Sequence, residues 1–307
     1  MKLNNPLVSV IIPTYNRESQ IVDTVTSVLK QTYQNFEIII VDDASEDHTV
    51  KVANSIDDSR INVVVLPSNT RGTLPRNIGI NRSIGEYIAL LDSDDLWEPN
   101  KLEKQLDFIA AVDTERFLCF TDVVLFDKKA EKLKLNTSLT SDRDIMDYIF
   151  IDDNCVQTST FIFPNHLGKE VLFDTSVKKH QDWDFCLRLR EAKTKFYHLS
   201  EPLVRHNIED LEGKITANNQ YLLSIEWGKR VESYLSTAAF LAFQVRTLFQ
   251  YYLLMGKRKT AFSQTFSAYG QGIVGRKRLL INTIKCFLPK AILRKLLGMQ
   301  REYSVDK

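Results

Sequence analysis

The stretch "EYIALLDSDDLWEP", Glu86 to Pro99, runs five strand-like residues into three aspartates, Asp92, Asp94 and Asp95. Like charges packed this closely repel one another and cost stability unless something positive lies among them. A divalent cation is the obvious counter-ion. The segment therefore predicts a strand that delivers a cluster of carboxylates to a binding site.

The sequence on the N-terminal side repeats this pattern of short apolar runs. "LVSVII" (7–12), "FEIIIVDD" (36–43) and "INVVVL" (61–66) also predict strands, and helical stretches near 19–31, 49–55 and 75–83 lie between them. In the first helix the spacing places Ile21, Val22, Val25, Val28 and Leu29 on one face. Runs without polar alternation are typical of strands buried on both faces, so we expect a parallel α/β sheet of the doubly wound kind.

Polar clusters follow three of these strands, at 13–17 ("PTYNR"), 42–47 ("DDASED") and 92–95 ("DSDD"). In doubly wound sheets ligands bind outside the carboxyl ends of the strands, so we expect the three loops to converge on one crevice. None of them contains the glycine pattern of a dinucleotide fold or of a phosphate loop. Any phosphate bound there would be held through a metal rather than by a glycine cradle.

Helix capping is the alternative explanation of the acidic cluster. Asp94 or Asp95 could accept hydrogen bonds from a helix that starts near Leu96, and Asp95 with Glu98 has the spacing of a capping box. Capping needs one aspartate rather than three. An EF-hand loop is excluded because Leu96 and Trp97 stand where that loop needs an oxygen ligand and a glycine. Metal or nucleotide binding is the preferred interpretation.

The composition is that of an ordinary globular protein of 307 residues, long enough for one large domain and an additional piece. No apolar run is long enough to cross a bilayer, and the N-terminus lacks the core of a signal sequence, so we expect a cytoplasmic protein. The four cysteines lie far apart without a Cys-x-x-Cys pair. This spacing argues against both a zinc site and a disulfide scaffold.

The net charge of +1 hides a strong asymmetry. Residues 1–215 contain 25 Lys and Arg against 35 Asp and Glu, whereas residues 216–307 contain 15 against 4. The first part therefore carries a charge of −10 and the second a charge of +11. This shift predicts a domain boundary near residue 215 and different partners for the two parts.

Four segments together carry a family resemblance: "VSVIIPTYNR" (8–17), "FEIIIVDDASEDHT" (36–49), "TRGTLPRNIGINRSIGEYIALLDSDDLWEP" (70–99) and "HQDWDFCLRL" (180–189). They resemble the family-two nucleotide-sugar glycosyltransferases and occur in that family's order, from about Val8 to about Leu203. The resemblance implies a GT-A fold: a Rossmann-like doubly wound mixed sheet with helices on both faces. Here it would comprise a nucleotide-sugar half (about 1–100) and an acceptor half (about 101–215), followed by a basic helical C-terminal region (216–307).

The resemblance also implies an activity and a set of binding residues. The enzyme would be an inverting hexosyltransferase that moves a sugar from a nucleoside diphosphate, UDP, to an acceptor hydroxyl during assembly of surface polysaccharide or glycoconjugates. The acceptor would be a sugar or a lipid-linked glycan. The residues that inherit contacts to the nucleotide sugar are Pro13, Thr14, Tyr15, Arg17, Asp42, Asp43, Arg76, Asp92 and Asp94. A Mn²⁺ or Mg²⁺ ion would be held by Asp94 and Asp95, with Asp95 as the direct ligand, and His206 is a further candidate.

The segment "KKHQDWDFCLRLREA" (178–192) resembles the part of the family that supplies the catalytic base. The family's usual Glu-Asp pair is Gln181-Asp182 here, so the chain departs at the first position and Asp182 inherits the role of the base. The alternative is that Asp182 caps an amphipathic helix over Trp183–Ala192, and both roles can hold together. A lone histidine is more often structural, which is the alternative for both His180 and His206.

Two other functions fit parts of this pattern. A sugar nucleotidyltransferase also has a nucleotide-binding α/β half, but such enzymes carry a glycine-rich loop after the first strand and "PTYNR" has no glycine. A non-catalytic sugar- or membrane-binding module is the second alternative. It gives no physical reason to retain carboxylates that repel one another.

The basic C-terminal region has two interpretations. In residues 273–299 Lys and Arg interleave with apolar residues and no acidic residue interrupts them. The region is either a helical cap that buries its apolar side, or a basic amphipathic surface that holds the enzyme peripherally on the anionic inner face of the cell membrane. Pro289 should divide it into two helices. Nucleic acid is a weaker alternative because no binding motif accompanies the charge.

Overall fold

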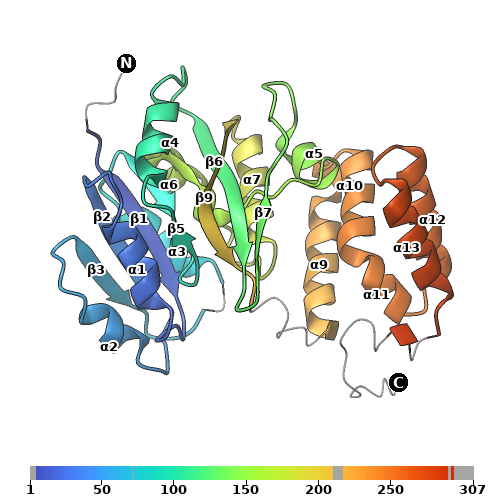
Figure 1. Cartoon of the computed structure of the whole chain (residues 1–307), viewed down its shortest axis with the longest axis horizontal. Coiled ribbons are helices and arrows are strands. Elements are labelled where there is room, and N and C mark those ends of the chain that lie inside the picture. The colour runs from blue at the N-terminus through green and yellow to red at the C-terminus, as the bar shows by residue number, and fades with distance from the viewer. Residues whose placement is uncertain (1–4, 71, 210–216, 290–291, 294–307) are drawn as a thin grey trace. The chain divides into compact units, whose positions relative to one another are not determined.

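The computed structural model describes residues 5–70, 72–209, 217–289 and 292–293 (Figure 1). The chain forms two compact units, which we call the sheet unit (Met1–Ile145 and Asn154–Lys214) and the helical unit (Met146–Asp153 and Ile215–Lys307). The expected boundary near residue 215 falls in 210–216, outside the described residues. The assignment of Met146–Asp153 to the helical unit had no signal in the sequence.

Four parallel strands form one half of the sheet, in the order β3-β2-β1-β4. They are β1 (Val8–Thr14), β2 (Phe36–Asp42), β3 (Ile61–Val65) and β4 (Tyr87–Leu90). Each lies within a predicted apolar run. In β1, Val8, Val10 and Ile12 pack into one core cluster while Ile11 faces the opposite helix layer, and all four are fully buried. Burial on both faces explains the absence of polar alternation.

Helices cover both faces of this half, as predicted. One face packs against α1 (Ile21–Leu29), α2 (Thr49–Asn54) and α4 (Lys101–Ile109); the other packs against α3 (Leu74–Arg82) and α6 (Asn165–Val171). In α1 the expected face is correct for Ile21, Val25 and Val28, whereas Val22 is exposed and Thr24 is buried in its place. Thr24 can be buried because its hydroxyl donates to the carbonyl of Asp95.

Helix α3 approaches β1 unusually closely at Gly79. A Cβ atom at this position would collide with the side chain of Ile11, so only glycine allows the contact. The close packing fixes α3 against the centre of the sheet. Arg76, one turn earlier on the same helix, is thereby held near the carboxyl ends of β1 and β4.

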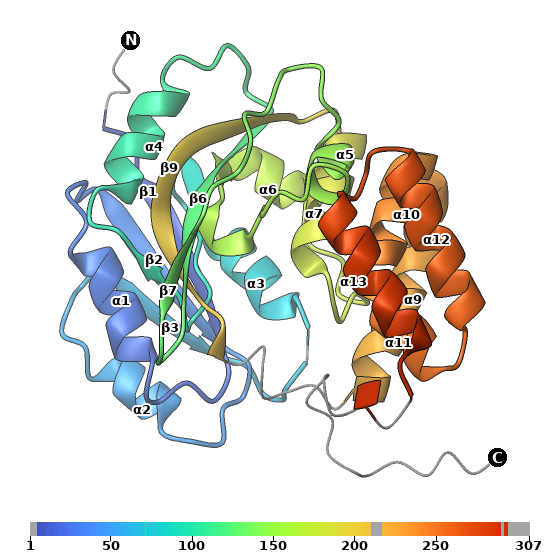
Figure 2. The same cartoon turned by 45° about the vertical axis from the view of Figure 1, so that its right-hand side comes forward.

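The second half of the sheet is mixed and extends it to nine strands (Figure 2). Its strands are β5 (Leu96–Trp97), β6 (Phe117–Phe126), β7 (Glu131–Lys134), β8 (Ile162–Pro164) and β9 (Lys195–Asn207). Strand β8 joins β4 to β6, β9 runs parallel to β6, and β5 pairs antiparallel with β9. The 3₁₀ turn η1 (Thr158–Thr160) and α7 (Gln181–Glu191) complete this half.

The position of β5 excludes the capping interpretation of the acidic cluster. Residues 96–97 form a strand, and the next helix begins only at Lys101. The register pairs Leu96 with Arg205. As a result, Asp95 lies beside His206 although 111 positions separate them in the sequence.

The helical unit has its own aromatic core. It includes α5 (Ile145–Phe150), whose first residue belongs to the sheet unit. The other elements are α9 (Ala217–Val231), η2 (Glu232–Tyr234), α10 (Thr237–Phe243), the π-helical turn η3 (Gln244–Leu248), α11 (Phe249–Leu254), α12 (Arg258–Gly270) and α13 (Arg276–Phe287). The rings of Phe150, Trp227 and Phe243 contact one another in pairs. Arg246 pairs with Asp153 at 2.6 Å and so ties the inserted segment to the unit.

Three expectations about the rest of the chain can be compared with the structure. Helix α13 ends two residues before Pro289, which agrees with the predicted break; most of the second helix expected after Pro289 lies outside the described residues. The four cysteines are all free thiols. Among the described helices, none combines the length and the apolar character that a bilayer span requires.

Candidate active site

The site lies where the strand order of the parallel half reverses. The chain passes from β1 to β2 on one side, and β4 later returns to the other side of β1. The amide of Leu91 donates to the carbonyl of Ile11 at 3.0 Å, which holds the ends of β4 and β1 together. Such a reversal leaves a crevice outside the carboxyl ends of the strands.

The three polar loops meet at this crevice, which confirms that they converge. Asn16, in the loop after β1, makes two hydrogen bonds to the loop after β2. Its backbone amide donates to the hydroxyl of Ser45, and its side-chain oxygen accepts from the amide of Glu46, both at 2.9 Å. Arg17 reaches from the same loop to the acidic cluster after β4, where it meets Asp94. Segments separated by up to 77 residues therefore form one site.

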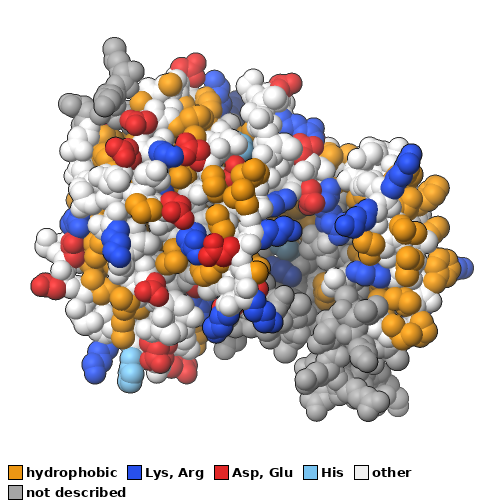
Figure 3. Space-filling model, viewed as in Figure 1, with side chains coloured by type: hydrophobic (Ala, Val, Ile, Leu, Met, Phe, Trp, Pro, Cys, Tyr) orange, Lys and Arg blue, Asp and Glu red, His pale blue; other side chains and the backbone are white. Residues whose placement is uncertain are grey.

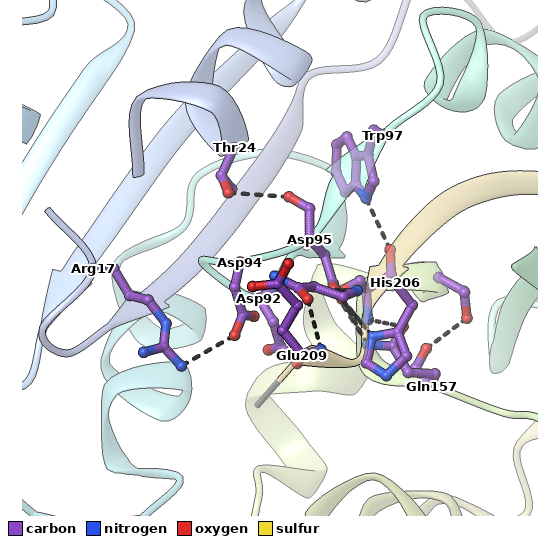
Figure 4. Close-up of polar contacts among 12 residues, drawn as sticks. Arg17, Thr24, Asp92, Asp94, Asp95, Trp97, Gln157, His206 and Glu209 are labelled. Atoms are coloured by element: carbon purple, nitrogen blue, oxygen red, sulfur yellow. Dashed lines mark hydrogen bonds and ion pairs between the residues drawn. The ribbon is translucent and has the colours of Figure 1, made fainter. Parts of the chain in front are cut away.

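The carboxylate of Asp94 has a single hydrogen-bond partner among the described residues, Arg17. Arg17 Nη2 donates to its Oδ2 at 3.0 Å, and both side chains are 21% exposed (Figure 4). Burial, followed by the charges of Asp95 and Asp92, raises the pKa of Asp94 to about 6, although Arg17 acts in the opposite direction. The repulsion inferred from the sequence is therefore present and only partly compensated.

Arg76 connects the acidic cluster to the start of α7. Its Nη2 donates to Asp92 at 2.5 Å, and its Nη1 donates to the side-chain oxygen of Gln181 at 2.8 Å. Its Nε is buried and has no hydrogen-bond partner among the described residues. One arginine therefore joins the two motifs that the sequence places almost 90 residues apart.

Asp182 follows Gln181 in the first turn of α7. The residue at the helix boundary is His180, in a left-handed conformation with φ of 62°, so Asp182 does not occupy the capping position that was expected. Its Oδ1 accepts from the amide of Trp183 at 2.9 Å. Burial raises the pKa of Asp182 to about 6, against that hydrogen bond and with a contribution from the charge of Asp92.

His180 has the structural role that was its alternative. Its ring stacks on Trp183 with the centroids 4.3 Å apart and the planes 6° from parallel. Burial, and then the neighbouring Lys179, lower the pKa of His180 to about 3. It is therefore a neutral, packed side chain at physiological pH.

Asp95 is fully buried, and both of its oxygens accept hydrogen bonds (Figure 4). Oδ1 accepts from the amide of Asn207 at 2.8 Å and from His206 Nδ1 at 3.0 Å; Oδ2 accepts from Ser159 Oγ at 2.6 Å and from Gln157 Nε2 at 2.8 Å. A carboxylate has about four acceptor positions, and these donors occupy them. The contacts argue against Asp95 as the direct metal ligand and favour Asp94.

His206 is oriented by this contact. Its Nδ1 faces Asp95, and its Nε2 has no hydrogen-bond partner among the described residues. Burial opposes protonation, but the hydrogen bond to Asp95 and the charges of Asp95, Asp92 and Asp94 prevail and raise the pKa of His206 to about 9. At neutral pH both ring nitrogens therefore carry a proton, and Nε2 can hold a cation only after its proton is lost. A carboxylate that fixes the other ring nitrogen is the usual arrangement of a histidine ligand.

The expected nucleoside contacts lie around the first two loops. Pro13 and Thr14 end β1, the Thr14 hydroxyl is buried without a partner among the described residues, and Tyr15 is exposed. The carboxylate of Asp42 accepts from the amide and hydroxyl of Ser45 at 2.8 and 2.5 Å. Asp43 accepts from the amide and hydroxyl of Thr70, both at 2.9 Å. Both carboxylates therefore stabilise loops of the crevice.

Three residues of the site were not identified from the sequence. Gln157 and Ser159 reach Asp95 from the η1 region, and the amide of Asn207 does so from the end of β9. Ser159 also accepts from the amide of Asp92, and its carbonyl accepts from the indole of Trp97. These residues stand in no recognisable motif, so only the tertiary contacts reveal them.

The chain is similar in sequence to known glycosyltransferases. The model of the family described as "Glycosyl transferase family 2" matches residues 9–166. The amylovoran biosynthesis glycosyltransferase AmsB of Erwinia amylovora is 29% identical over 270 residues, which cover 85% of this chain and 89% of that protein.

Solved structures share the fold over almost the whole chain. S. aureus TarS 1–349 in complex with UDP-GlcNAc superposes with a TM-score of 0.62 at 17% identity, covering 97% of this chain and 94% of that one. The mannosyltransferase PcManGT from Pyrobaculum calidifontis, in complex with GDP-Man and Mn²⁺, gives 0.54 at 16% identity, covering 96% and 84%. These similarities place the sheet unit among the GT-A folds. Because the family model covers more than half of the chain, and includes the loops of the crevice and the acidic cluster, this protein is a glycosyltransferase that belongs to glycosyl transferase family 2.

Proposed function

We propose that the protein is an inverting, metal-dependent glycosyltransferase that transfers a sugar from a UDP-sugar to an acceptor hydroxyl. The observation that carries this proposal is the Arg76 bridge, which joins Asp92 of the acidic cluster to Gln181, the neighbour of Asp182. Donor binding and proton acceptance both need residues at one place, and the bridge supports the proposal because it holds the two motifs together. The family assignment removes the nucleotidyltransferase and non-catalytic alternatives.

The residues present fit a divalent cation bound jointly with the donor. Among the described residues, no three His, Cys, Asp or Glu side chains are grouped to hold a metal alone. Mg²⁺ and ions like it are commonly bound through one or two carboxylates together with substrate phosphates. We propose Asp94 as the direct ligand, with His206 Nε2 as a further contact, and Asp95 as the residue that holds His206 in place. When bound, the ion would stabilise negative charge on the departing nucleoside diphosphate.

The two arginines are proposed to serve the same diphosphate. In the structure Arg17 and Arg76 lie against Asp94 and Asp92, so their charges are already concentrated at the crevice. Guanidinium groups bind phosphate oxygens through paired hydrogen bonds. We propose that Pro13, Thr14, Tyr15, Asp42 and Asp43 line the nucleoside end of the crevice, where the two aspartates also fix the loops.

Asp182 is proposed as the general base. In a one-step inverting transfer, the acceptor oxygen forms a bond to the anomeric carbon while the bond from that carbon to the phosphate oxygen breaks. The proton of the acceptor hydroxyl passes to the Asp182 carboxylate, and the nucleoside diphosphate leaves with the electron pair. A pKa of about 6 keeps Asp182 ionised at neutral pH and makes it a stronger base than an ordinary aspartate.

The biological setting follows from the relatives and is also a proposal. AmsB is named for biosynthesis of amylovoran. By analogy we propose that this enzyme takes part in assembling a surface polysaccharide or glycoconjugate. Its acceptor would be a sugar or a lipid-linked glycan, and the reaction would take place at the cytoplasmic face of the cell membrane.

The test is a screen of nucleotide sugars for release of the nucleoside diphosphate, with Mn²⁺ or Mg²⁺ and with a chelator. We expect release with a UDP-sugar that depends on the metal, and a loss of roughly 10²-fold in Asp94→Asn, the scale of a lost electrostatic contact to the transition state. Asp107→Asn, an exposed acidic residue on α4, is the matched control and should keep full activity. Release that persists in the chelator would refute the metal assignment, and no release from any nucleotide sugar would refute the function.

A further inference from the structure

We propose that α12 and α13 present a preformed surface that lies in the interface of an anionic lipid membrane. The sequence left two interpretations of this region, a cap with its apolar side buried and a membrane-binding surface. The orientation of α13 distinguishes them. The proposal does not depend on the catalytic chemistry, because every residue involved belongs to the helical unit.

Helix α13 buries its less apolar side. Its buried residues are Asn282 and Cys286, and Asn282 donates to the hydroxyl of Thr265 at 3.3 Å. Phe287, Leu280 and Ile284 are instead 75%, 62% and 52% exposed. A helix packed as an ordinary cap would show the reverse distribution. The apolar side of α13 therefore lacks cover from the described residues.

The exposed apolar side chains continue across α12, which packs against α13. Phe266 is 59% exposed, and Phe262 joins the two helices: its ring centroid lies 6.3 Å from that of Phe266 and 6.3 Å from that of Phe287. We call this surface the apolar face. It consists of Phe262, Phe266, Leu280, Ile281, Ile284 and Phe287. Figure 3 shows apolar side chains gathered over the helices at this end of the helical unit, with Lys and Arg side chains among them.

The two helices that carry the apolar face have charged residues of a single sign. Its helices carry exposed Lys259, Arg276, Lys277 and Arg278. No acidic residue occurs in the sequence between Glu232 and Glu302. Three further basic residues of this region, Lys290, Arg294 and Lys295, lie outside the described residues.

This combination favours an anionic bilayer over other partners. Helices that lie in a membrane interface combine an apolar side with Lys and Arg, whose long side chains reach the headgroups. Face-to-face association with a second copy would bring like charges together, which is unfavourable. A nucleic-acid duplex, whose bases are already stacked, would satisfy the charges but would leave the phenylalanines in water. Of these three partners, a lipid surface is the one that satisfies both the apolar and the basic side chains.

The surface is held in place by the fold. Arg258 donates to the carbonyls of Cys286 and Leu288 at 3.2 and 2.6 Å, which fixes the C-terminal end of α13 against α12. Beneath it, Phe249, Leu253, Ala261 and Cys286 belong to a separate buried cluster. Substitutions on the apolar face should therefore change binding without unfolding the unit.

The experiment measures binding of the full-length protein to vesicles of phosphatidylcholine with and without phosphatidylglycerol, by sedimentation at low and high salt. We expect binding only with phosphatidylglycerol, weakened by salt. Phe266→Ser/Phe287→Ser should lower the affinity about tenfold or more, on the expectation that binding strength follows the buried apolar area. Ile84→Ser/Leu135→Ser, a pair with similar exposure in the sheet unit (77% and 55%), should bind as the wild type does.

A charge variant provides the second test. It keeps the proposal testable if the phenylalanine variant does not fold. Lys277→Gln/Arg278→Gln should weaken binding and reduce its dependence on salt, whereas Lys129→Gln/Lys193→Gln in the sheet unit should not. Circular dichroism and the melting temperature verify that each variant is folded. Wild-type protein that ignores phosphatidylglycerol, or variants of the apolar face that bind as well as the wild type, would overturn the proposal. A dimer in light scattering that the phenylalanine variant abolishes, without vesicle binding, would assign the surface to a second copy instead.

Discussion

The sheet unit and the helical unit treat clustered charge in opposite ways. In the sheet unit each of the three clustered aspartates forms an ion pair within the same unit. The pairs are Asp92 with Arg76, Asp94 with Arg17 and Asp95 with His206. In the helical unit the exposed basic residues of α13 lie in a stretch of sequence without any acidic residue. Charges of one sign can be concentrated where the fold supplies counter-charges. Helices α12 and α13 have no acidic residue of their own, so the counter-charge for their exposed basic residues must come from elsewhere.

The apolar residues differ in the same way. The apolar strands of the sheet unit are buried on both faces, whereas α13 turns its most apolar side outward. An acidic cluster with internal partners therefore marks a site that the protein has already assembled. A basic and apolar surface without internal partners marks a site that is completed only by a partner.

The largest expected effect comes from removing Asp182, the carboxylate that we propose as the general base. Asp182→Asn should bind the donor nearly normally and lose on the order of 10²-fold or more in turnover, the scale of general-base catalysis. Turnover and nucleotide affinity are measured separately. Glu226→Gln removes one exposed acidic charge from the helical unit and should leave turnover unchanged. An unchanged turnover in Asp182→Asn would move the base elsewhere.

The next effect tests whether the partners of the acidic cluster are truly internal. Repulsion alone predicts that removing one of three carboxylates is harmless, but Asp95 accepts from His206, Ser159 and Gln157 in a fully buried place. Asp95→Ala should therefore lower the free energy of unfolding by about 3 kcal/mol, because it leaves the partly buried His206 and the buried donors Ser159 and Gln157 without their acceptor.

Chemical denaturation measures this change, with Asp94→Asn as the comparison. Burial and the neighbouring carboxylates raise the pKa of Asp94, which means that its ionised form is disfavoured in the folded protein. Its replacement should therefore cost little stability or none. Equal destabilisation by the two substitutions would show that Asp95 is not the structural member of the cluster.

A smaller effect is expected from pH. Because the pKa of Asp182 is raised to about 6, protonation removes the base as the pH falls, and kcat/KM should drop about tenfold per unit below about pH 6. The folded protein binds this proton more tightly than the unfolded chain, so this group stabilises the fold as the pH falls from about 6 towards 4.

The two measurements together identify the cause of any acid loss. As the pH is lowered, kcat/KM should fall. The contribution of Asp182 to the melting temperature should not fall over the same range. Asp182→Asn should lack the acidic limb. A limb that survives in this variant would assign the titration to another group, such as Asp94, whose pKa is raised to about the same value.

The smallest effect tests the departure from the family pattern. Gln181→Glu restores the usual carboxylate next to Arg76 and adds a negative charge beside Asp182. The added charge should raise the pKa of Asp182 and move the acidic limb to higher pH by less than about one unit. Gln181→Asn, which stays neutral, is the control and should leave the position of the limb unchanged. A limb that moves to lower pH would mean that Arg76 dominates the local field.

Much of the sheet unit could be predicted because its signals are local. Unbroken apolar runs mark strands that are buried on both faces. Apolar residues at helical spacing between these runs mark the helices. The convergence of the loops after β1, β2 and β4 also followed, since parallel strands end at one edge of the sheet. Within α1, Val22 was misplaced because periodicity gives only a face and does not reveal the buried hydroxyl contact made by Thr24.

The division of labour within the acidic cluster could not be predicted in this way. In the sequence Asp94 and Asp95 are adjacent and chemically identical. Their difference arises because β5 pairs with β9, which brings His206 and Asn207 to Asp95, and because η1 adds Gln157 and Ser159. These contacts span more than 60 residues and leave no local pattern.

By itself, the sequence determined the doubly wound sheet, the acidic cluster at a strand end, and the opposite charges of the two parts of the chain, because each depends on residue type and short spacing. Only the tertiary structure decided which aspartate is buried and which lies within reach of Arg17, that Arg76 links Asp92 to Gln181, and which side of α13 is exposed. Those outcomes depend on the long-range pairing of strands and the packing of helices. The free energy of burying one side chain depends on neighbours that the chain brings from distant positions, and local sequence carries no record of them.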